Sequence, residues 1–132
     1  MTPTQKIKWA ILAKAASWTA QPLPAVTAEN VDELYAALVA VDGHWDAKNE
    51  VRCSGQPSGI PCKVDVMLTR HYDHQAVAAK MPDGSWVGWV YWHGGGKFGE
   101  PSALAWMEHA YALDCAEREV IRIERTFSLA AA

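Results

Sequence analysis

The sequence predicts an α+β fold, in which two N-terminal helices pack on an antiparallel sheet of about four to five strands and one short helix is inserted. Apolar residues recur at helical spacing through residues 1–42, and they alternate at strand spacing from residue 63 onward. A turn signal separates two of the strands. The 132 residues are expected to form a single domain with a helical part (1–42), an irregular loop (43–62) and a β-rich part (63–129).

Two helices are expected in the first part of the chain. Thr2 is placed to cap the first helix, Pro3 suits its first position, and Gln5 completes a capping box. An apolar stripe follows at helical spacing and consists of Ile7, Ile11, Ala15 and Trp18. The second helix is expected to begin at Thr27 and to end at Asp42-Gly43. Its expected buried face consists of Val31, Leu34, Tyr35 and Leu38.

Strands and turns are expected from residue 63 onward. The alternation predicts strands over residues 64–69, 75–81, 86–92, 111–116 and 120–129. Pro82-Asp83-Gly84 is expected to form a hairpin turn in which Gly84 has a positive φ, and a second turn is expected at Glu117-Arg118-Glu119. A short helix is expected to start near Glu100-Pro101-Ser102. The loop 43–62 is expected to hold a short edge strand near residues 50–53 or to act as a mobile binding arm.

Charge and cysteine content exclude several classes of protein. The net charge of −3 argues against binding of phosphate or nucleic acid through a bulk positive field, and it is too small for a mimic of nucleic acid. Three cysteines cannot all pair within one chain, which favours a reducing cytoplasm over a disulfide framework. No secretion signal or membrane span is expected. We therefore expect a cytoplasmic protein without membrane contact, either a monomer or a homodimer.

An aromatic strand that runs into a glycine turn is the most distinctive feature of the chain. Trp86 and Trp92 are expected on one side of this strand, and Trp89 and Tyr91 on the other. Glycines in succession let backbone amides face one concavity, and the lysine that follows adds charge, so the turn is a candidate anion nest. The simpler interpretation is a flexible turn beside rings that belong to the core. The candidate ligand- or partner-binding residues are Trp92, His93, Gly94, Gly95, Gly96, Lys97, Phe98 and Glu100.

Metal binding and catalysis receive weaker support. The candidate metal ligands are Cys53, Cys62, His71 and His74, but their spacing lacks the short Cys-x2-4-Cys pair of a zinc site. Glu100, Glu108 and His109 are candidates for an acid or base, yet no local signature of a nucleophile is present. We expect no cofactor, and a non-catalytic role is favoured over an enzyme.

A resemblance to a known family adds context. The chain resembles a family of small phage- and prophage-encoded proteins of unassigned function. The residues that carry the resemblance are Arg70-His71-Tyr72, those from Val77 to Trp89, those from Tyr91 to Lys97, Gly99-Glu100-Pro101, Trp106-Met107-Glu108, Ala110-Tyr111 and Arg125-Thr126-Phe127. It covers about the last half of the chain and, more loosely, residues 27–41 and 43–46. His93 stands where an aromatic is expected and Phe98 where histidine is expected, which weakens a metal role for the turn.

The resemblance implies an accessory protein of a mobile element in a bacterial cytoplasm, and it supplies no catalytic residues. We therefore expect a non-catalytic protein that binds a host or phage macromolecule, with modulation of host defence as one role that this context suggests. Two alternatives stay open. One is a small-ligand protein that holds a phosphate or nucleotide at the glycine turn, and the other is a metal-stabilised domain or hydrolase.

Overall fold

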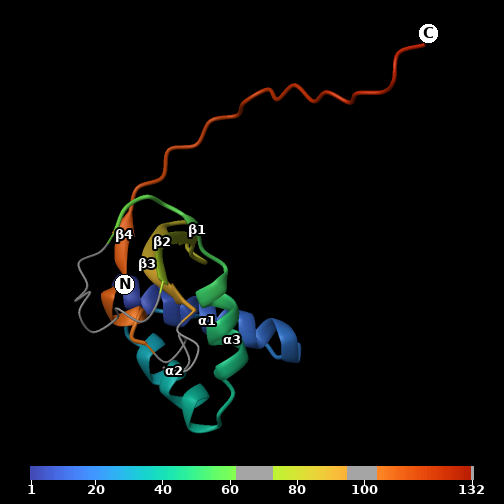
Figure 1. Ribbon diagram of the computed structural model, residues 1–132. Coiled ribbons are helices and arrows are strands. Elements are labelled where there is room, and N and C mark those ends of the chain that lie inside the picture. Colours follow the sequence, from blue (N-terminus) through green and yellow to red (C-terminus); the bar gives the residue numbers. More distant parts are fainter. Residues whose placement is uncertain (62–72, 95–103, 132) are drawn as a thin grey trace.

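The computed structural model describes residues 1–61, 73–94 and 104–131, and it confirms an α+β fold with the helices N-terminal (Figure 1). Within these residues the chain forms three α-helices, a short 3-10 helix and an antiparallel sheet with strand order β1-β2-β3-β4. The elements are α1 (Pro3–Thr19), α2 (Val31–Ala40), α3 (Trp45–Cys53), β1 (Gln56–Pro57), β2 (Asp73–Lys80), β3 (Trp86–His93), η3 (Met107–His109) and β4 (Tyr111–Leu113). The strand expected over 64–69 lies outside the described residues.

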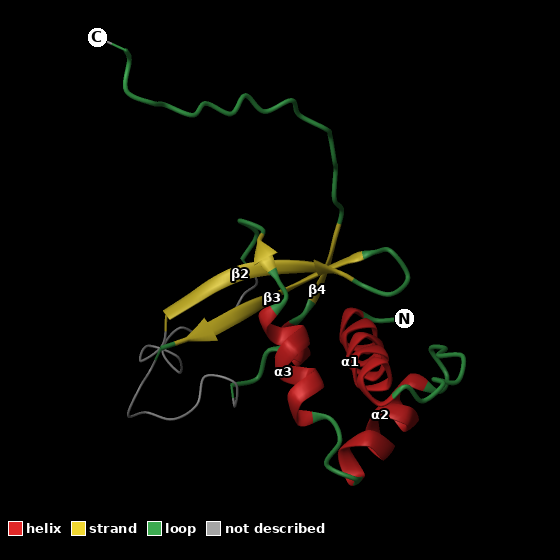
Figure 2. Ribbon diagram, turned by 90° about the vertical axis from the view of Figure 1, so that its right-hand side faces the viewer, coloured by secondary structure: helices red, strands yellow, loops and turns green. Residues whose placement is uncertain are grey.

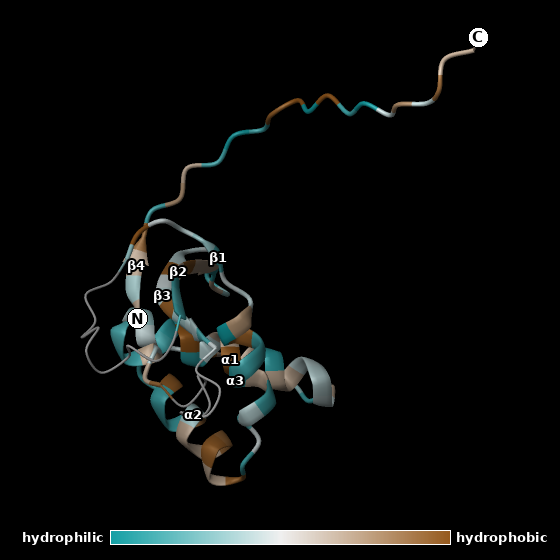
Figure 3. Cartoon of the chain, in the orientation of Figure 1, coloured by the Kyte–Doolittle hydropathy of each residue, from teal (hydrophilic) through white to brown (hydrophobic). Residues whose placement is uncertain are grey.

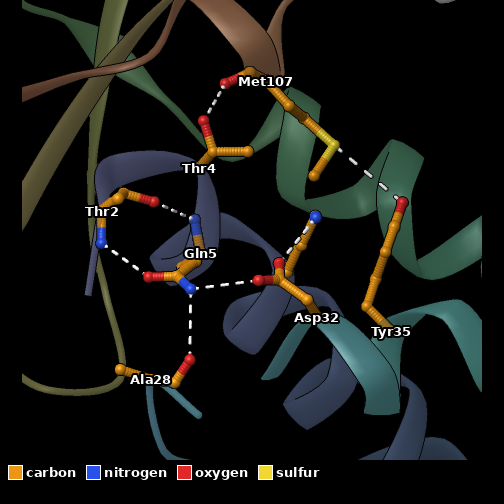
Figure 4. A network of polar contacts seen from close by, with 8 residues as sticks. Thr2, Thr4, Gln5, Ala28, Asp32, Tyr35 and Met107 are labelled. Carbon is orange, nitrogen blue, oxygen red and sulfur yellow. Dashed lines mark hydrogen bonds and ion pairs between the residues drawn. The ribbon is translucent and has the colours of Figure 1, made fainter. Parts of the chain in front are cut away.

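The capping box predicted for α1 is confirmed. The Thr2 hydroxyl accepts the Gln5 amide at 3.1 Å, and the Gln5 side chain accepts the Thr2 amide at 2.9 Å, so two otherwise unpaired backbone donors are satisfied (Figure 4). The side-chain Nε2 of Gln5 donates to the carboxylate of Asp32 in α2 at 3.1 Å, and Lys8 Nζ donates to the same carboxylate at 2.8 Å. These contacts fasten α2 to the first turns of α1.

The second helix forms, but it begins at Val31 and not at Thr27. Thr27 and Asn30 instead close a turn before the helix, in which each accepts the backbone amide of the other, at 3.3 and 2.7 Å. The predicted end is confirmed, because Asp42 adopts a positive φ of 56° and the Gly43 amide bonds the Leu38 carbonyl at 3.0 Å.

The irregular loop expected over 43–62 was a wrong prediction. Residues 45–53 form α3, and residues 56–57 form the edge strand β1, so no strand occupies 50–53. Ala47 and Val51 lie four residues apart and are both buried, which gives α3 a narrow apolar side. Asp46 in the first turn and Arg52 in the last turn also suit the helix dipole.

The hairpin of β2 and β3 is the longest part of the sheet and forms as predicted. Lys80 pairs with Trp86 and Val77 with Trp89, and the connecting turn is Pro82-Asp83-Gly84. Gly84 has φ +85°, and the Met81 amide bonds the Ser85 carbonyl at 2.7 Å. This geometry is that of a three-residue hairpin loop closed by a glycine bulge.

The core lies between the helices and one face of the sheet (Figure 2). Ile7 and Ile11 of α1 are fully buried, and they cluster with Val87 and Trp89 of β3. The remaining buried members of this cluster are Ala47, Val51, Val77, Met81, Trp106 and Met107. The Thr4 hydroxyl donates to the Met107 carbonyl at 2.8 Å, so the chain after β3 closes on the start of α1 (Figure 4).

The C-terminal part of the chain differs most from the sequence expectations. Of the short helix expected near residue 100, the described part contains only η3, and the strand expected over 111–116 is limited to β4. Residues 114–131 form neither helix nor strand and leave the body of the fold in an extended path (Figure 1). The predictions of a turn at 117–119 and of a strand at 120–129 were therefore wrong for the single chain. Residues 114–131 contain no turn, and none of them has a positive φ.

No helix in the described parts of the chain combines the length and apolar character needed to cross a membrane.

A pH dependence follows from the β2–β3 turn. Hydrogen bonds from the Ser85 hydroxyl and amide, at 2.6 and 3.0 Å, and Lys6 at 3.4 Å hold the pKa of the Asp83 carboxyl below its ordinary value of 3.8. A lowered pKa stabilises the folded state above pH 3.8, and this stabilisation is lost as the pH falls through the lower folded value. The free energy of unfolding, measured with urea across this acidic range, should therefore fall less steeply with decreasing pH for Asp83→Asn than for the wild type. Glu117→Gln, in the exposed C-terminal segment, serves as the control, and its free energy of unfolding should depend on pH as that of the wild type does. If the free energy of unfolding of Asp83→Asn had the same pH dependence as that of the control, the prediction would be contradicted.

Candidate functional site

The aromatic end of β3 carries the first candidate site, and the structure describes only its beginning. Trp92 is buried, whereas His93 and Gly94 are exposed, and Gly94 has φ +74°. The remaining predicted members, Gly95, Gly96, Lys97, Phe98 and Glu100, lie outside the described residues. Trp92 and His93 are the last two residues of β3, and the positive φ of Gly94 is one that only glycine adopts without strain.

The two faces of β3 separate as the alternation predicted. Trp89 faces the helices and lies against Trp106, with ring centroids 5.4 Å apart. Trp92 points to the opposite face and contacts the ring of His74 on β2 at 5.2 Å. These rings therefore pack within the fold, while Trp45 of α3 is 63% exposed.

Arg52 is the residue of this region that the sequence reading missed. It ends α3, is only 5% exposed, and donates a hydrogen bond to the backbone carbonyl of Trp92. Its guanidinium lies 4.6 Å from the centre of the Tyr91 ring, and Tyr91 in turn stacks on His93 at 5.7 Å. The indole of Trp89 donates to the Arg52 carbonyl at 3.3 Å. Arg52 therefore joins the end of α3 to the end of β3 through both its backbone and its side chain.

The charge of Arg52 is only partly compensated. No ion pair to its guanidinium is found among the described residues, and its buried Nε has no hydrogen-bond partner there. A buried charge of this kind is costly unless it is paired, and the Tyr91 ring face and the Trp92 carbonyl supply part of the compensation. This arrangement fixes the aromatic end of β3 in place.

The candidate metal ligands do not assemble in the described structure. Cys53 is an exposed thiol 3.9 Å from both the Tyr91 hydroxyl and the Asn49 side chain, and His74 lies against Trp92. Cys62 and His71 lie outside the described residues. Among the residues that are described, no three side chains of His, Cys, Asp or Glu are close enough to hold a metal ion together.

Other polar groups are buried without partners in the described part. His44 precedes α3, its ring centroid lies 4.4 Å from that of Trp45, and its Nδ1 makes no hydrogen bond within the described residues.

Glu108 and His109, the candidate acid and base, lie in η3 and are exposed. Burial and the nearby Glu108 charge raise the pKa of the Tyr35 hydroxyl.

The described residues also line grooves elsewhere on the surface. One, of about 460 Å³, is lined by Lys14 of α1, Val51 of α3 and Lys80 of β2, among others. A second, of about 400 Å³, lies between the ends of α1 and α2 beside Trp18. The third, of about 260 Å³, lies on the sheet face opposite the helices, and its lining includes Ile60, Trp86, Leu113 and Cys115. None of the three is lined by Trp92, His93 or Gly94.

The second candidate site is the extended C-terminal segment. Its apolar side chains are nearly or wholly open to solvent, with exposed fractions of 100% at Ile121, 71% at Ile123, 87% at Phe127 and 101% at Leu129. All four occupy odd positions, so in an extended chain they share one side with Arg125, which we call the apolar side, whereas Val120, which is 71% exposed, lies on the other side. Arg122 and Glu124 lie on the other side, 3.9 Å apart. The alternation of polar and apolar residues along this segment is visible in Figure 3.

Comparison of the chain with protein-family models, with curated proteins and with solved structures finds no match.

Proposed function

We propose that this protein is a non-catalytic protein-binding module, and that it recognises a partner protein by pairing residues 120–129 with it as a β-strand. The observation that supports this proposal is the exposed apolar side of that segment. An extended chain with one apolar and one polar side has the form that strand addition to a sheet edge requires, because the backbone supplies hydrogen bonds and alternate side chains supply specificity.

The energetics favour a covered state of this segment. Burial of an Ile, Leu or Phe side chain is worth about 1.5–3 kcal/mol, and four such side chains lie on the apolar side. Contiguous exposed apolar surface of this kind is typical of interaction sites. Because strand pairing requires backbone donors and acceptors, the partner is a polypeptide and not a nucleic acid, which also accords with the net charge of −3.

The wider biological role is part of the same proposal. The aromatic and glycine string resembles that of a family of small phage- and prophage-encoded proteins. This resemblance supports a phage or prophage origin, and therefore a host or phage protein as the class of partner. The exposed His93 and Gly94 lie at the end of β3, away from the segment that carries the proposal. They are assigned no part in recognition through residues 120–129.

The test compares the two sides of the segment. Ile121→Ser, Ile123→Ser and Phe127→Ser are combined to remove the apolar side, and Arg122→Ser, Glu124→Ser and Thr126→Ser are combined as the control on the polar side. A tagged full-length chain is mixed with untagged chain and bacterial lysate, and the captured proteins are quantified by mass spectrometry.

We expect the wild type and the polar-side control to retain the same specific partner and the apolar-side variant to lose it. Amide hydrogen exchange should show protection of residues 120–129 in the complex, because paired strand amides exchange slowly. Equal capture by all three proteins, or capture without protection of these amides, would show that the segment is not the recognition element.

A further inference from the structure

We propose that, when no partner strand is present, the apolar side of residues 120–129 is covered by a second copy of this chain, which receives it in the groove of about 400 Å³ between the ends of α1 and α2. This inference concerns the same segment as the proposed function, but the binding surface and the mode of binding are different. It depends on what lines the groove and on one arginine of the segment.

The groove offers apolar surface that is open to solvent. Among its lining residues, Leu12 is buried and Leu38 is half-buried, whereas Trp18 and Val41 are 53% and 74% exposed. A cavity of about 150 Å³ can hold a benzene ring, so this groove has room for a phenylalanine ring and a further apolar side chain. Exposed apolar surface that is contiguous in this way is typical of an interaction site.

The groove also favours a positive charge. α1 and α2 begin side by side, because Gln5 and Lys8 of α1 both bond Asp32 of α2, and both helices end at this groove. Each helix C-terminus carries about half of an elementary negative charge. Neither helix has a basic residue in its last turn, whereas α3 has Arg52 there. None of the described residues that line the groove is a lysine, arginine or histidine, so we expect its occupant to supply the cation.

The apolar side of residues 120–129 combines apolar side chains with a cation. Arg125 lies between Ile123 and Phe127 on that side, and alternate side chains of an extended chain are about 7 Å apart. Insertion of Phe127 or Ile123 into the groove would therefore bring the guanidinium of Arg125 to the two helix ends. A guanidinium also packs favourably against the face of an indole ring, which the half-exposed Trp18 supplies.

The path of the chain favours a second copy over docking within one chain. Residues 114–131 leave the body of the fold beside β4, and α2 lies at the opposite end of the molecule in both views (Figures 1 and 2). Each copy has one segment and one groove, so two copies can exchange their segments reciprocally. A two-fold exchange of this kind closes at the dimer.

The experiment reverses the charges on the two sides of the proposed contact. Val41→Lys places a cation in the groove, and Arg125→Glu places an anion on the segment. The matched control is Val39→Lys, which adds the same charge to the end of the same helix at a residue that does not line the groove. Sedimentation velocity of the full chain across a dilution series measures self-association. The rate of tryptic cleavage after Arg122, followed by mass spectrometry, reports whether the segment is covered.

We expect the wild type and the Val39→Lys control to be dimers that dissociate on dilution. Val41→Lys and Arg125→Glu should each weaken the dimer about tenfold or more, and their combination should restore most of the affinity, because the reversed pair attracts again. Cleavage after Arg122 should be slow in the dimers and fast in the two single variants.

Several results would overturn the proposal. These are a wild type that is monomeric throughout the dilution series, a Val41→Lys variant that dimerises like its control, and a double variant that associates no better than the single variants. A monomer in which Val41→Lys still speeds cleavage after Arg122 would mean that the segment occupies its own groove, so a second copy would be the wrong occupant.

This inference and the proposed function fail separately. Val41→Lys leaves the segment itself unchanged, so it should capture a partner protein at least as well as the wild type does. If the wild type is a monomer but the triple serine variant of the apolar side loses a captured protein, the groove is wrong and strand recognition stands. If the dimer depends on Val41 and Arg125 but no captured protein depends on the apolar side, the groove stands and strand recognition is wrong.

Discussion

Replacement of Trp89 by alanine is expected to lower the free energy of unfolding by about 3–5 kcal/mol, the range measured when buried Phe or Trp side chains are truncated. The Trp89 side chain is 0% exposed and lies among Ile7, Ile11 and Val87. Its loss would also remove the tilted ring contact with Trp106, whose centroid lies 5.4 Å away, and the hydrogen bond to the Arg52 carbonyl at 3.3 Å. Such a loss is a large share of the stability of an ordinary domain.

The matched control is Trp45→Ala, which removes the same side chain from a position that is 63% exposed. Surface substitutions usually change stability by no more than about 0.5 kcal/mol. Urea unfolding followed by far-ultraviolet circular dichroism measures both variants. Similar losses in the two variants would mean that Trp89 does not occupy the core described here.

Replacement of Gly88 by valine is the second large expected effect. A β-carbon at Gly88 would lie 2.7 and 2.8 Å from ring carbons of Tyr111 and 2.9 Å from the Leu113 side chain. Both neighbours belong to β4, so the added side chain forces β4 away from β3. Overpacking of this kind typically costs about 1–3 kcal/mol. Unfolding experiments measure the loss of stability, and hydrogen exchange of residues 111–113 reports the detachment of β4.

Two further variants distinguish the steric clash with β4 from a nonspecific loss of stability. Gly59→Ala introduces a β-carbon that meets nothing within 4 Å at a residue with φ +74°, so it carries backbone strain without a clash and should leave β4 protected. In the Gly88→Val protein, Tyr111→Ala removes the ring that is struck. Because contacting residues are coupled, the double variant should lose less stability than the sum of the two single changes. Simple additivity of the two losses would argue against this contact.

Local signals explain which elements could be predicted from the sequence. The start of α1 depends on Thr2, Pro3 and Gln5, and the β2–β3 turn depends on three adjacent residues, so both were correctly predicted. Helix α3 was missed because its apolar side consists of Ala47 and Val51 among polar neighbours, which is too short a pattern to reveal a helical period.

Long-range contacts explain what was missed at the candidate site. The role of Arg52 depends on the Trp92 carbonyl and the Tyr91 ring, which belong to a strand far along the chain. An arginine at the end of a polar helix gives no sign that it will be buried. The alternation at 120–129 predicted a strand, but the structure forms none there, because a period of two does not supply a sheet edge for the segment to pair with.

The contact between Thr4 and Met107 joins residues 103 positions apart in the sequence. It has a consequence for the protein while it is being made. The ribosome releases α1 first, yet the apolar stripe of α1 can complete its packing only when Trp106 and Met107 have emerged. Until then the nascent chain exposes Ile7 and Ile11, and pairings of high sequence separation form slowly. Folding of this domain is therefore expected to finish late in translation, which makes the growing chain a natural client for chaperones that bind exposed apolar segments.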